Sequence, residues 1–411
     1  MESKNMNAND QAEYHQDNSI LFALFTIWSL IVICRPQDYF SLIGHLRPAL
    51  VLGLLLLLLS ALKTNKKPVD IVNNSQLRLY RYMLIMLMIS IPFSYYRSGS
   101  LFDLLQYSSV AIFVFMFYVY VNTILRLRKL LFLYCIGIGL YGIAILLKGS
   151  FEEGRISFGT MFDPNDIAFY ILSFITLNLI FMTKNNSLFV RTISLFNITT
   201  GLIIILKTGS RGGLVALLMV IAFLLFSKNR VFNTSLITKA AILMMVFLLL
   251  QFINFNNARY KTILDLRDDY NTTGEEGRIA IWKSGMKMMF THPFTGVGFN
   301  RFPEGAGRDR EARGLDSAKW QTAHNSLIQI GAETGIIGFI LFWVLSLNAF
   351  KIFSRISRNS ESGELAAIGE FAKVGFLGLF VGAMFLSQAY SVYWAFYIGF
   401  SAVMKRFAED L

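Results

Sequence analysis

The sequence predicts an all-α polytopic membrane protein of about 12 transmembrane helices, with one long extracytoplasmic loop that carries an amphipathic helix. Of the 411 residues, 55% are hydrophobic and only 16% are charged. This apolar content exceeds what one soluble core needs. Apolar runs also recur along nearly the whole chain between short polar loops, which excludes a soluble enzyme with a single anchor.

Residues 1–18 are polar and lack the basic region and cleavage site of a signal peptide, so we expect a cytoplasmic N-terminus and a retained first span. Apolar runs of about 15 to 20 residues are the expected spans. The region 19–253 holds them at 19–34, 48–62, 79–93, 103–122, 130–147, 166–182, 192–207, 212–226 and 236–253. The region 326–404 holds them at 326–350, 369–387 and 389–404. The last two leave little room for a turn, so eleven spans is the alternative.

Lysine and arginine alternate between rich and sparse loops along the chain. The rich set runs from Lys63 and Arg81 through Arg126 and Lys351 to Lys405. Since cytoplasmic loops are enriched in these residues, we expect the rich side, both termini and the tail 405–411 to be cytoplasmic. The remaining loops face outward.

Composition also limits the chemistry. The net charge of +12 comes from lysines and arginines at the ends of apolar runs, so we expect contact with membrane lipids and no nucleic acid. Cys34 and Cys135 lie in separate apolar segments, which indicates no disulfide scaffold. His292 and His324 are far apart and no acidic cluster appears, so we expect no metal and no cofactor.

One outward segment, 254–325, is too long for a connector, and such loops are usually functional. Within it RIAIWKSGMKMMF, residues 278–290, has apolar residues at helical spacing. We expect an amphipathic helix there, lying at the membrane surface.

The stretch TGSRGG, residues 208–213, places Arg211 at the outer mouth of two spans, ahead of a helix expected to start after Gly213. A helix N-terminus attracts anions, glycines let a ligand approach the backbone, and guanidinium matches phosphate oxygens. This pattern suits a diphosphate. A snorkelling arginine that marks the interface explains Arg211 equally well.

The stretch TAHNSLIQIGAETGIIGF, residues 322–339, opens the next span. Ser326 and Gln329 fit a capping box, which would place His324 just outside the helix N-terminus. A neutral imidazole there can accept a proton from an incoming hydroxyl, and Asn325 can orient the ring or the substrate. The alternative for His324 is a solvated loop histidine.

The same stretch contains a GxxxG pattern and an acidic residue. Gly331 and Gly335 indicate helix packing. Glu333 is a carboxyl inside the membrane, which is costly and requires a partner.

Two further cations face outward. In GRISFGTMFDPNDIAFY, residues 154–170, Pro164 and Asn165 predict a capped helix start, and Arg155 precedes it. Arg278 stands at the head of the amphipathic segment, beside two glutamates.

Taken in order, FDPNDIAFY, TGSRGG, RIAIW with HPFTGVGFNRF, and AHNSLIQIGAETGIIG resemble the bacterial O-antigen ligase and O-antigen polymerase superfamily, most strongly over 155–339. The resemblance implies metal-independent, inverting glycosyl transfer at the outer face of the bacterial cytoplasmic (inner) membrane. The donor would be an undecaprenyl-diphosphate-linked glycan and the acceptor a hydroxyl of a glycan or of lipid A core.

By the same resemblance Arg211 holds the diphosphate and Arg278 shares its charge. His324 acts as the base or orients the acceptor, while Arg155 and Asn165 line the donor site. The sequence leaves open ligation, polymerisation of O-antigen or exopolysaccharide, and protein glycosylation, with polymerisation slightly favoured. A polymerase would have a chain-length regulator as a further partner.

A transporter or flippase for lipid-linked oligosaccharide is the alternative function. Transporters concentrate polar residues and broken helices near the bilayer midplane. Here such residues lie mostly at the outer mouth, with Glu333 as the exception.

Overall fold

The computed structural model describes residues 8–36, 48–62, 71–152, 154–159, 163–183, 185–226, 277–315 and 320–409, with side chains from 19 onward. Within these residues the chain is helical apart from one two-stranded hairpin and the connecting loops. The predicted all-α class is confirmed.

The helices follow the apolar runs. Every expected span except 236–253, which lies outside the described residues, overlaps helical structure. The elements are α1 Ala8–Cys34, α3 Pro48–Leu62, α4 Ser75–Ser90, η3 Ile91–Phe93, α5 Arg97–Tyr120, α6 Ile124–Lys148, β1 Ser150–Glu152, β2 Arg155–Ser157, α7 Pro164–Ile175, α8 Asn178–Phe181, α9 Leu188–Lys207, α10 Arg211–Phe226, α14 Arg278–Thr291, α15 Phe302–Ala312, α16 Ser326–Asn359, α17 Gly363–Ala383 and α18 Val392–Glu409.

Several helices have the length and composition of membrane spans. Six qualify among the described residues: Arg97–Tyr120, Ile124–Lys148, Pro164–Phe181, Leu188–Lys207, Ser326–Asn359 and Gly363–Ala383. Shorter apolar helices cover Ser19–Cys34, Pro48–Leu62 and Arg211–Phe226. The chain is therefore a multi-pass membrane protein, and the number twelve stays a prediction.

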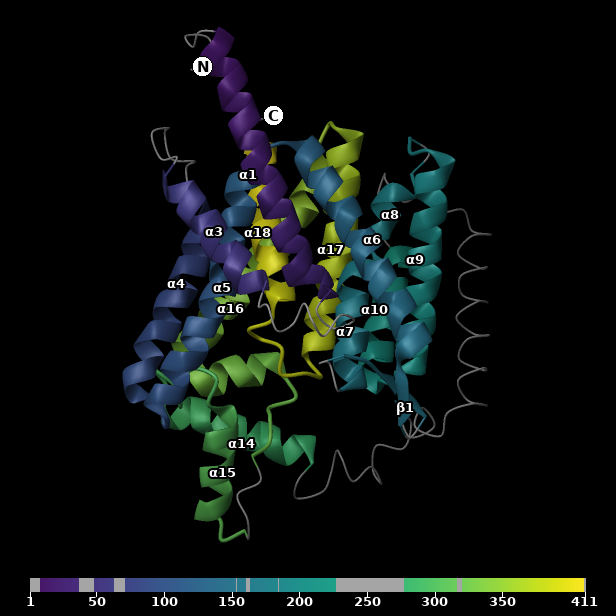
Figure 1. Cartoon of the computed structure of the whole chain (residues 1–411). Coiled ribbons are helices and arrows are strands. Elements are labelled where there is room, and N and C mark those ends of the chain that lie inside the picture. Colours follow the sequence, from purple (N-terminus) through teal and green to yellow (C-terminus); the bar gives the residue numbers. More distant parts are fainter. Residues whose placement is uncertain are drawn as a thin grey trace.

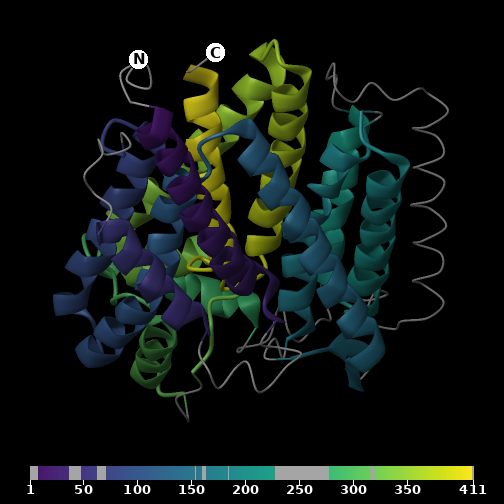
Figure 2. The same cartoon turned by 45° about the horizontal axis from the view of Figure 1, so that its top comes forward.

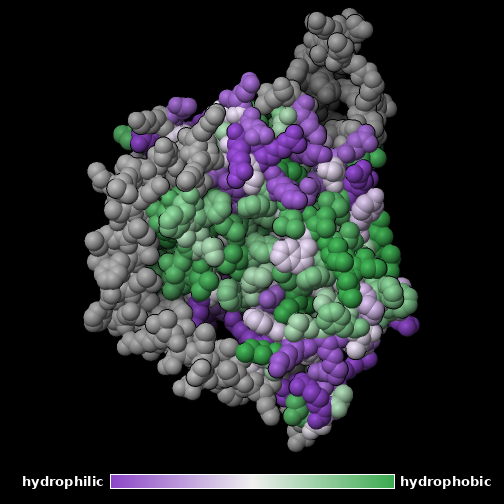
Figure 3. Space-filling model, turned by 180° about the vertical axis from the view of Figure 1, so that it is seen from behind, coloured by the Kyte–Doolittle hydropathy of each residue, from purple (hydrophilic) through white to green (hydrophobic). Residues whose placement is uncertain are grey.

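The surface and the chain ends agree with this arrangement. Figure 3 shows a band of hydrophobic residues across the middle of one face, with hydrophilic residues above and below it. Figure 1 places the N-terminal end of α1 and the C-terminal end of α18 at one end of the bundle, and α14, α15 and β1 at the other. The tilted view in Figure 2 shows the same separation. The start of α1 and the end of α18 thus lie on the same side, and the assignment of that side to the cytoplasm stays a prediction from the lysine and arginine pattern.

Interlocking aromatic rings hold the centre of the bundle. Phe396 of α18 lies 5.8 Å from Phe117 of α5 and 5.2 Å from Phe174 of α7, between ring centroids. On α16, Phe353 lies 5.3 Å from Phe400. Such pairs add directional attraction to the burial of large rings, so they fix α18 against its neighbours.

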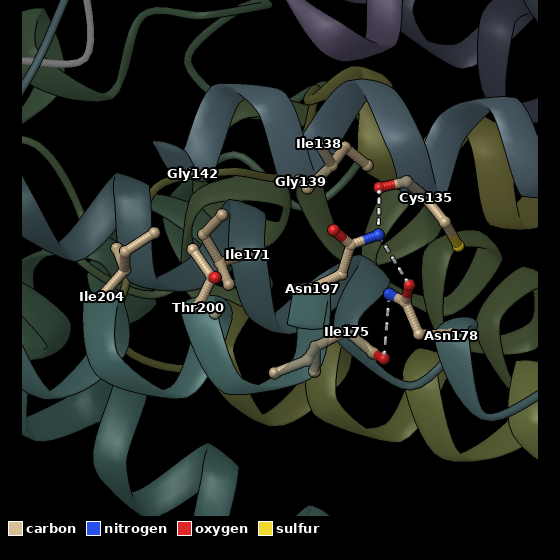
Figure 4. Close-up of a pocket in the computed structure, with 11 residues that line it drawn as sticks. Cys135, Ile138, Gly139, Gly142, Ile171, Ile175, Asn178, Asn197, Thr200 and Ile204 are labelled. Atoms are coloured by element: carbon tan, nitrogen blue, oxygen red, sulfur yellow. Dashed lines mark hydrogen bonds between the residues drawn. The ribbon is translucent and has the colours of Figure 1, made fainter. Parts of the chain in front are cut away.

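A polar network ties α6, α8 and α9 together within the bundle (Figure 4). The Asn197 side-chain amide donates to the Cys135 carbonyl at 3.0 Å and to Asn178 Oδ1 at 3.2 Å. A side chain at position 139 would collide with the Asn197 amide, so only glycine fits there. Side-chain hydrogen bonds between helices are favourable in an apolar medium. They help fix α9 against α6 and α8, next to α7. The start of α7 carries Asn165, and α9 leads into the turn before Arg211.

Candidate active site

A break in α16 shapes the end of the bundle that carries α14 and α15. Gly335 has φ 73° and ψ −170°, a backbone region open essentially only to glycine. The loop that follows α14 fills the break. Ile336 N donates to Pro293 O at 2.7 Å, and Val297 N donates to Ala332 O at 2.8 Å. Backbone groups freed inside a membrane helix must find such partners. The loop after α14 thus supplies hydrogen-bond partners to the backbone of α16 at the break.

The predicted packing role of the GxxxG pattern holds for only one of its glycines. A Cβ at Gly331 would lie 2.6 Å from Met289 Sδ, so Gly331 packs closely against α14. A Cβ at Gly335 would instead collide with the Pro293 carbonyl. Gly335 therefore serves the break and the docking of the loop.

Replacement of Gly335 by alanine is expected to destabilise the protein strongly, because it combines a forbidden backbone conformation with this collision. The matched control is Gly314→Ala, which also has a positive φ of 71° but has no atom within 4 Å of the added Cβ. That control should show only the cost of a left-handed residue, about 1–2 kcal/mol. Melting temperatures of the two detergent-purified variants measure the difference. Equal losses would contradict the docking of the loop at Gly335.

Glu333 has the partners that the sequence required. Its side chain is fully buried, Oε1 accepts from Phe302 N at 3.0 Å, and Oε2 accepts from Tyr390 Oη at 2.6 Å. The carboxylate thus joins α16 to the first residue of α15 and to the loop between α17 and α18. Buried charges with several donors hold distant segments in one arrangement.

The N-terminus of α16 differs from the expected capping box. Asn325 is the cap, and its Oδ1 accepts from Leu327 N at 3.0 Å and from Ile328 N at 3.1 Å. Ser326 Oγ donates to the Leu386 carbonyl instead, so the capping-box prediction is wrong. Asparagine caps as well as serine, and the serine finds a tertiary partner that the sequence does not reveal. The role of Asn325 in orienting the imidazole or the substrate stays a prediction.

His324 lies directly before this cap in an unusual conformation. Its φ is 47°, which is uncommon for any residue with a side chain and is typical of strained functional positions. Its backbone N–H donates to Ser387 Oγ at 2.8 Å. The preceding Ala323 carbonyl accepts from Trp282 Nε1 at 3.1 Å. Contacts on both sides thus fix His324 at the head of α16.

The electrostatic surroundings keep the His324 imidazole neutral. Burial, followed by the positive charge of Arg278, holds the pKa of His324 below its usual value of 6.5, while Asp163 opposes this shift. Arg278 and Asp163 therefore lie close enough for their charges to act on the ring. A neutral ring at physiological pH has a nitrogen that can accept a proton.

The predicted capped helix start is confirmed, and the helix begins at Pro164, two residues before the expected span. Asp163 caps α7 by accepting from Asn165 N at 2.9 Å, with Pro164 in the first helical position. The Arg155 guanidinium, on β2, donates to Asn165 Oδ1 at 3.1 Å and to the Thr208 carbonyl at 2.9 Å. Arg155 thereby joins the hairpin, α7 and the turn that follows α9.

The TGSRGG turn starts α10 earlier than predicted. The helix begins at Arg211, and the Ser210 side chain caps it by accepting from Gly213 N at 3.1 Å. A Cβ at Gly212 would lie 2.6 Å from Phe385 Cβ. A Cβ at Gly213 would lie 2.7 Å from Ala168 Cβ. Both glycines thus serve close packing. Because α10 begins at Arg211, the expected start after Gly213 is wrong. Arg211 is half-buried in the first turn.

A small pocket unites these segments near the N-terminal ends of α7, α10 and α14. It is lined, among others, by Asn165, Ser210, Gly212, Gly213, Arg278 and Phe385. The pocket brings Asn165 and Arg278 together beside the first helical turn of α10, which begins with Arg211. Arg155 is bonded to Asn165, and Arg278 acts on His324. Arg155, Asn165 and Arg278 thus come together from three separate parts of the chain. Arg211 precedes Gly212 of the pocket, and His324 is bonded through its backbone to Ser387, which follows Leu386 of the pocket.

The loop between α17 and α18 contributes residues that the sequence prediction missed. Gln388 Nε2 donates to Asp166 Oδ1 at 2.8 Å, and Ser387 holds the backbone of His324. The expected spans 369–387 and 389–404 left almost no loop here, whereas α17 ends at Ala383 and α18 starts at Val392. The polar residues in SQAYS were the signal for this longer loop.

Comparison with known proteins supports the resemblance. Residues 196–343 match the family model described as O-antigen ligase. This range includes Arg211, Arg278 and His324, and it ends within α16, before the last two helices. No curated protein matches the chain.

Proposed function

We propose that this member of the O-antigen ligase and polymerase superfamily transfers a glycan from undecaprenyl diphosphate to an acceptor hydroxyl at the outer face of the cytoplasmic membrane. The family supports lipid-linked glycan transfer in general. The observation that supports the specific proposal is the pocket lined by Asn165 and Arg278 at the start of α10, which Arg211 opens. Leu386 of this pocket precedes Ser387, which accepts from the His324 backbone N–H. The pocket lies at the end of the bundle opposite the start of α1 and the end of α18.

The proposed chemistry is one inverting displacement. The acceptor oxygen attacks the anomeric carbon, a new C–O bond forms, and the bond from that carbon to the diphosphate oxygen breaks. The electron pair leaves with undecaprenyl diphosphate, and a ring nitrogen of His324 takes the hydroxyl proton. Arg211 and Arg278 bind the diphosphate and stabilise its growing negative charge. Arg155 and Asn165 line the donor site, and Asn325 holds the start of α16.

The acceptor decides between two forms of this activity. A glycan acceptor makes the protein a polymerase of O-antigen or exopolysaccharide, for which a chain-length regulator is a partner, and a lipid A core acceptor makes it a ligase. We favour polymerisation slightly. Both forms place the protein as a multi-pass component of the inner membrane with cytoplasmic termini.

The experiment uses the purified full-length chain in detergent with a lipid-linked glycan, with and without a metal chelator. We expect release of undecaprenyl diphosphate, equal in both samples, because arginines rather than a metal neutralise the leaving group. Among the described residues no group of three or more His, Cys, Asp or Glu side chains is placed to hold a metal ion. Binding of intact donor with no release of undecaprenyl diphosphate would favour the flippase. Loss of release on chelation would overturn the metal-independent mechanism.

A further inference from the structure

A second hollow lies at the extracytoplasmic end, apart from the pocket at Arg278. It is formed by the segment before α5, by α15 and by Trp320. We call it the aromatic groove. Its lining includes Tyr95, Tyr96, Glu304, Arg308, Glu311 and Trp320.

The lining combines exposed aromatic rings with hydrogen-bonding side chains. Trp320 is 64% exposed and Tyr96 is 54% exposed, although both rings are large and apolar. Glu304 and Glu311 supply carboxylate acceptors and Arg308 supplies donors. A saccharide matches this mixture, because its C–H face stacks on aromatic rings and its hydroxyls hydrogen-bond to charged groups. Two carboxylates would repel a phosphate, so the groove does not suit the diphosphate of the donor.

The aromatic walls are held in place before any ligand binds. The Arg301 guanidinium forms ion pairs with Asp103 and Glu304 and lies 5.5 Å from the centroid of the Tyr96 ring. The Arg308 guanidinium lies 4.1 Å from the centroid of the Tyr95 ring. Such cation–π contacts and partly buried ion pairs reduce the cost of ordering the groove on binding.

The groove adjoins the candidate active site through the backbone. Trp320 and His324 are joined by the segment 320–324, so their Cα atoms are at most about 14 Å apart. The Arg278 pocket has walls from α7, α10 and the loop after α17, including Leu386. The next residue, Ser387, accepts from the His324 backbone N–H, so this loop joins the pocket to His324. His324 thus lies along the chain between two hollows, the pocket at Arg278 and the aromatic groove. The two hollows are built from different elements.

We propose that the aromatic groove binds the glycan of the acceptor and presents its hydroxyl to His324. This assignment rests on the proposed transfer reaction, in which the diphosphate of the donor binds at the pocket at Arg278. The groove therefore sets which glycan is extended, and Trp320 and Tyr96 are its stacking residues.

The test measures binding without turnover. Oligosaccharides released from the surface polysaccharide of the source bacterium are titrated into the purified full-length chain, without donor. We expect Trp320→Ala and Tyr96→Ala each to weaken binding up to about tenfold. Trp320→Phe keeps a stacking ring and should retain most of the affinity. The matched control is Phe294→Ala, because Phe294 is 72% exposed at the same end but does not line the groove.

Turnover separates this inference from the proposed function. With donor present, Trp320→Ala should raise the KM for the acceptor and leave the KM for the donor unchanged. If the chain shows no transfer activity but oligosaccharide binding still depends on Trp320, the proposed function is wrong and the saccharide groove stands. Active transfer with unchanged acceptor binding and KM would overturn the groove. A raised donor KM alone would overturn the acceptor assignment. Equal losses in Phe294→Ala would assign these rings to the membrane interface.

Discussion

Replacement of Arg278 by glutamine is expected to lower glycan transfer by about 10²–10³-fold while the protein still inserts and folds, because removing one preorganised charge donor from a transition state has an effect of this size. Arg278 lines the pocket beside Arg211 and acts on the His324 ring. Arg278→Lys should recover part of the activity, since it keeps the charge but loses the two-pronged geometry that matches phosphate. The measurement is release of undecaprenyl diphosphate by purified variants.

Lys283 offers a matched control for this variant. It lies on the same helix, α14, and is exposed. Lys283→Gln removes the same charge from α14 outside the pocket, so it should leave transfer unchanged. If Lys283→Gln and Arg278→Gln reduce transfer equally, a general cationic surface explains the effect. If Arg278→Gln retains full transfer, Arg278 does not bind the diphosphate.

Replacement of His324 by asparagine is expected to lower kcat/KM by about 10²–10⁴-fold, the usual contribution of a positioned base. Asparagine is chosen because it tolerates a left-handed backbone, so the conformation at φ 47° and the bond from the backbone N–H to Ser387 are kept. A variant that folds normally but loses transfer would show that the reaction needs the imidazole of His324 and not only its backbone conformation. Unchanged transfer would remove His324 from the mechanism.

The pH profile of the wild-type protein gives a second check on His324. Its pKa is lowered by burial and by Arg278, so protonation requires a more acidic solution than for a free imidazole. The base is neutral and active above that pKa. Transfer should therefore persist down through pH 6.5 and fall only below it. In the residual activity of Arg278→Gln the acid limb should move to higher pH, and an unmoved limb would contradict the closeness of the two residues.

Local sequence patterns predicted the elements well where each pattern is contained in one helix. The run 48–62 is α3 without any change of bounds, and the amphipathic segment 278–290 is helical as α14, with Ile281, Gly285 and Met288 on its buried side. The break of α16 was not predictable in this way. It depends on a loop around Pro293, distant in sequence, that supplies the missing hydrogen bonds. A hydropathy pattern treats 326–350 as one continuous span.

The candidate site shows the same division. Arg155, Asn165 and Arg211 could be singled out as candidates because each interrupts or flanks an apolar run, which makes a polar residue conspicuous. Ser387 and the aromatic groove were missed because their partners come from other helices, and the sequence alone gives no pairing. The cap of α16 was misplaced by one residue, since Asn325 and Ser326 are both good caps and only the bond from Ser326 to the Leu386 carbonyl decides between them.

The most direct measurement is an experimental structure of the full chain in a lipid nanodisc with undecaprenyl diphosphate bound. We predict that the two phosphates lie between the guanidinium groups of Arg211 and Arg278 at the extracytoplasmic start of α10, with the His324 ring facing the terminal phosphate. Phosphates bound on another face of the molecule, or guanidinium groups of Arg211 and Arg278 that diverge from the ligand, would contradict this account.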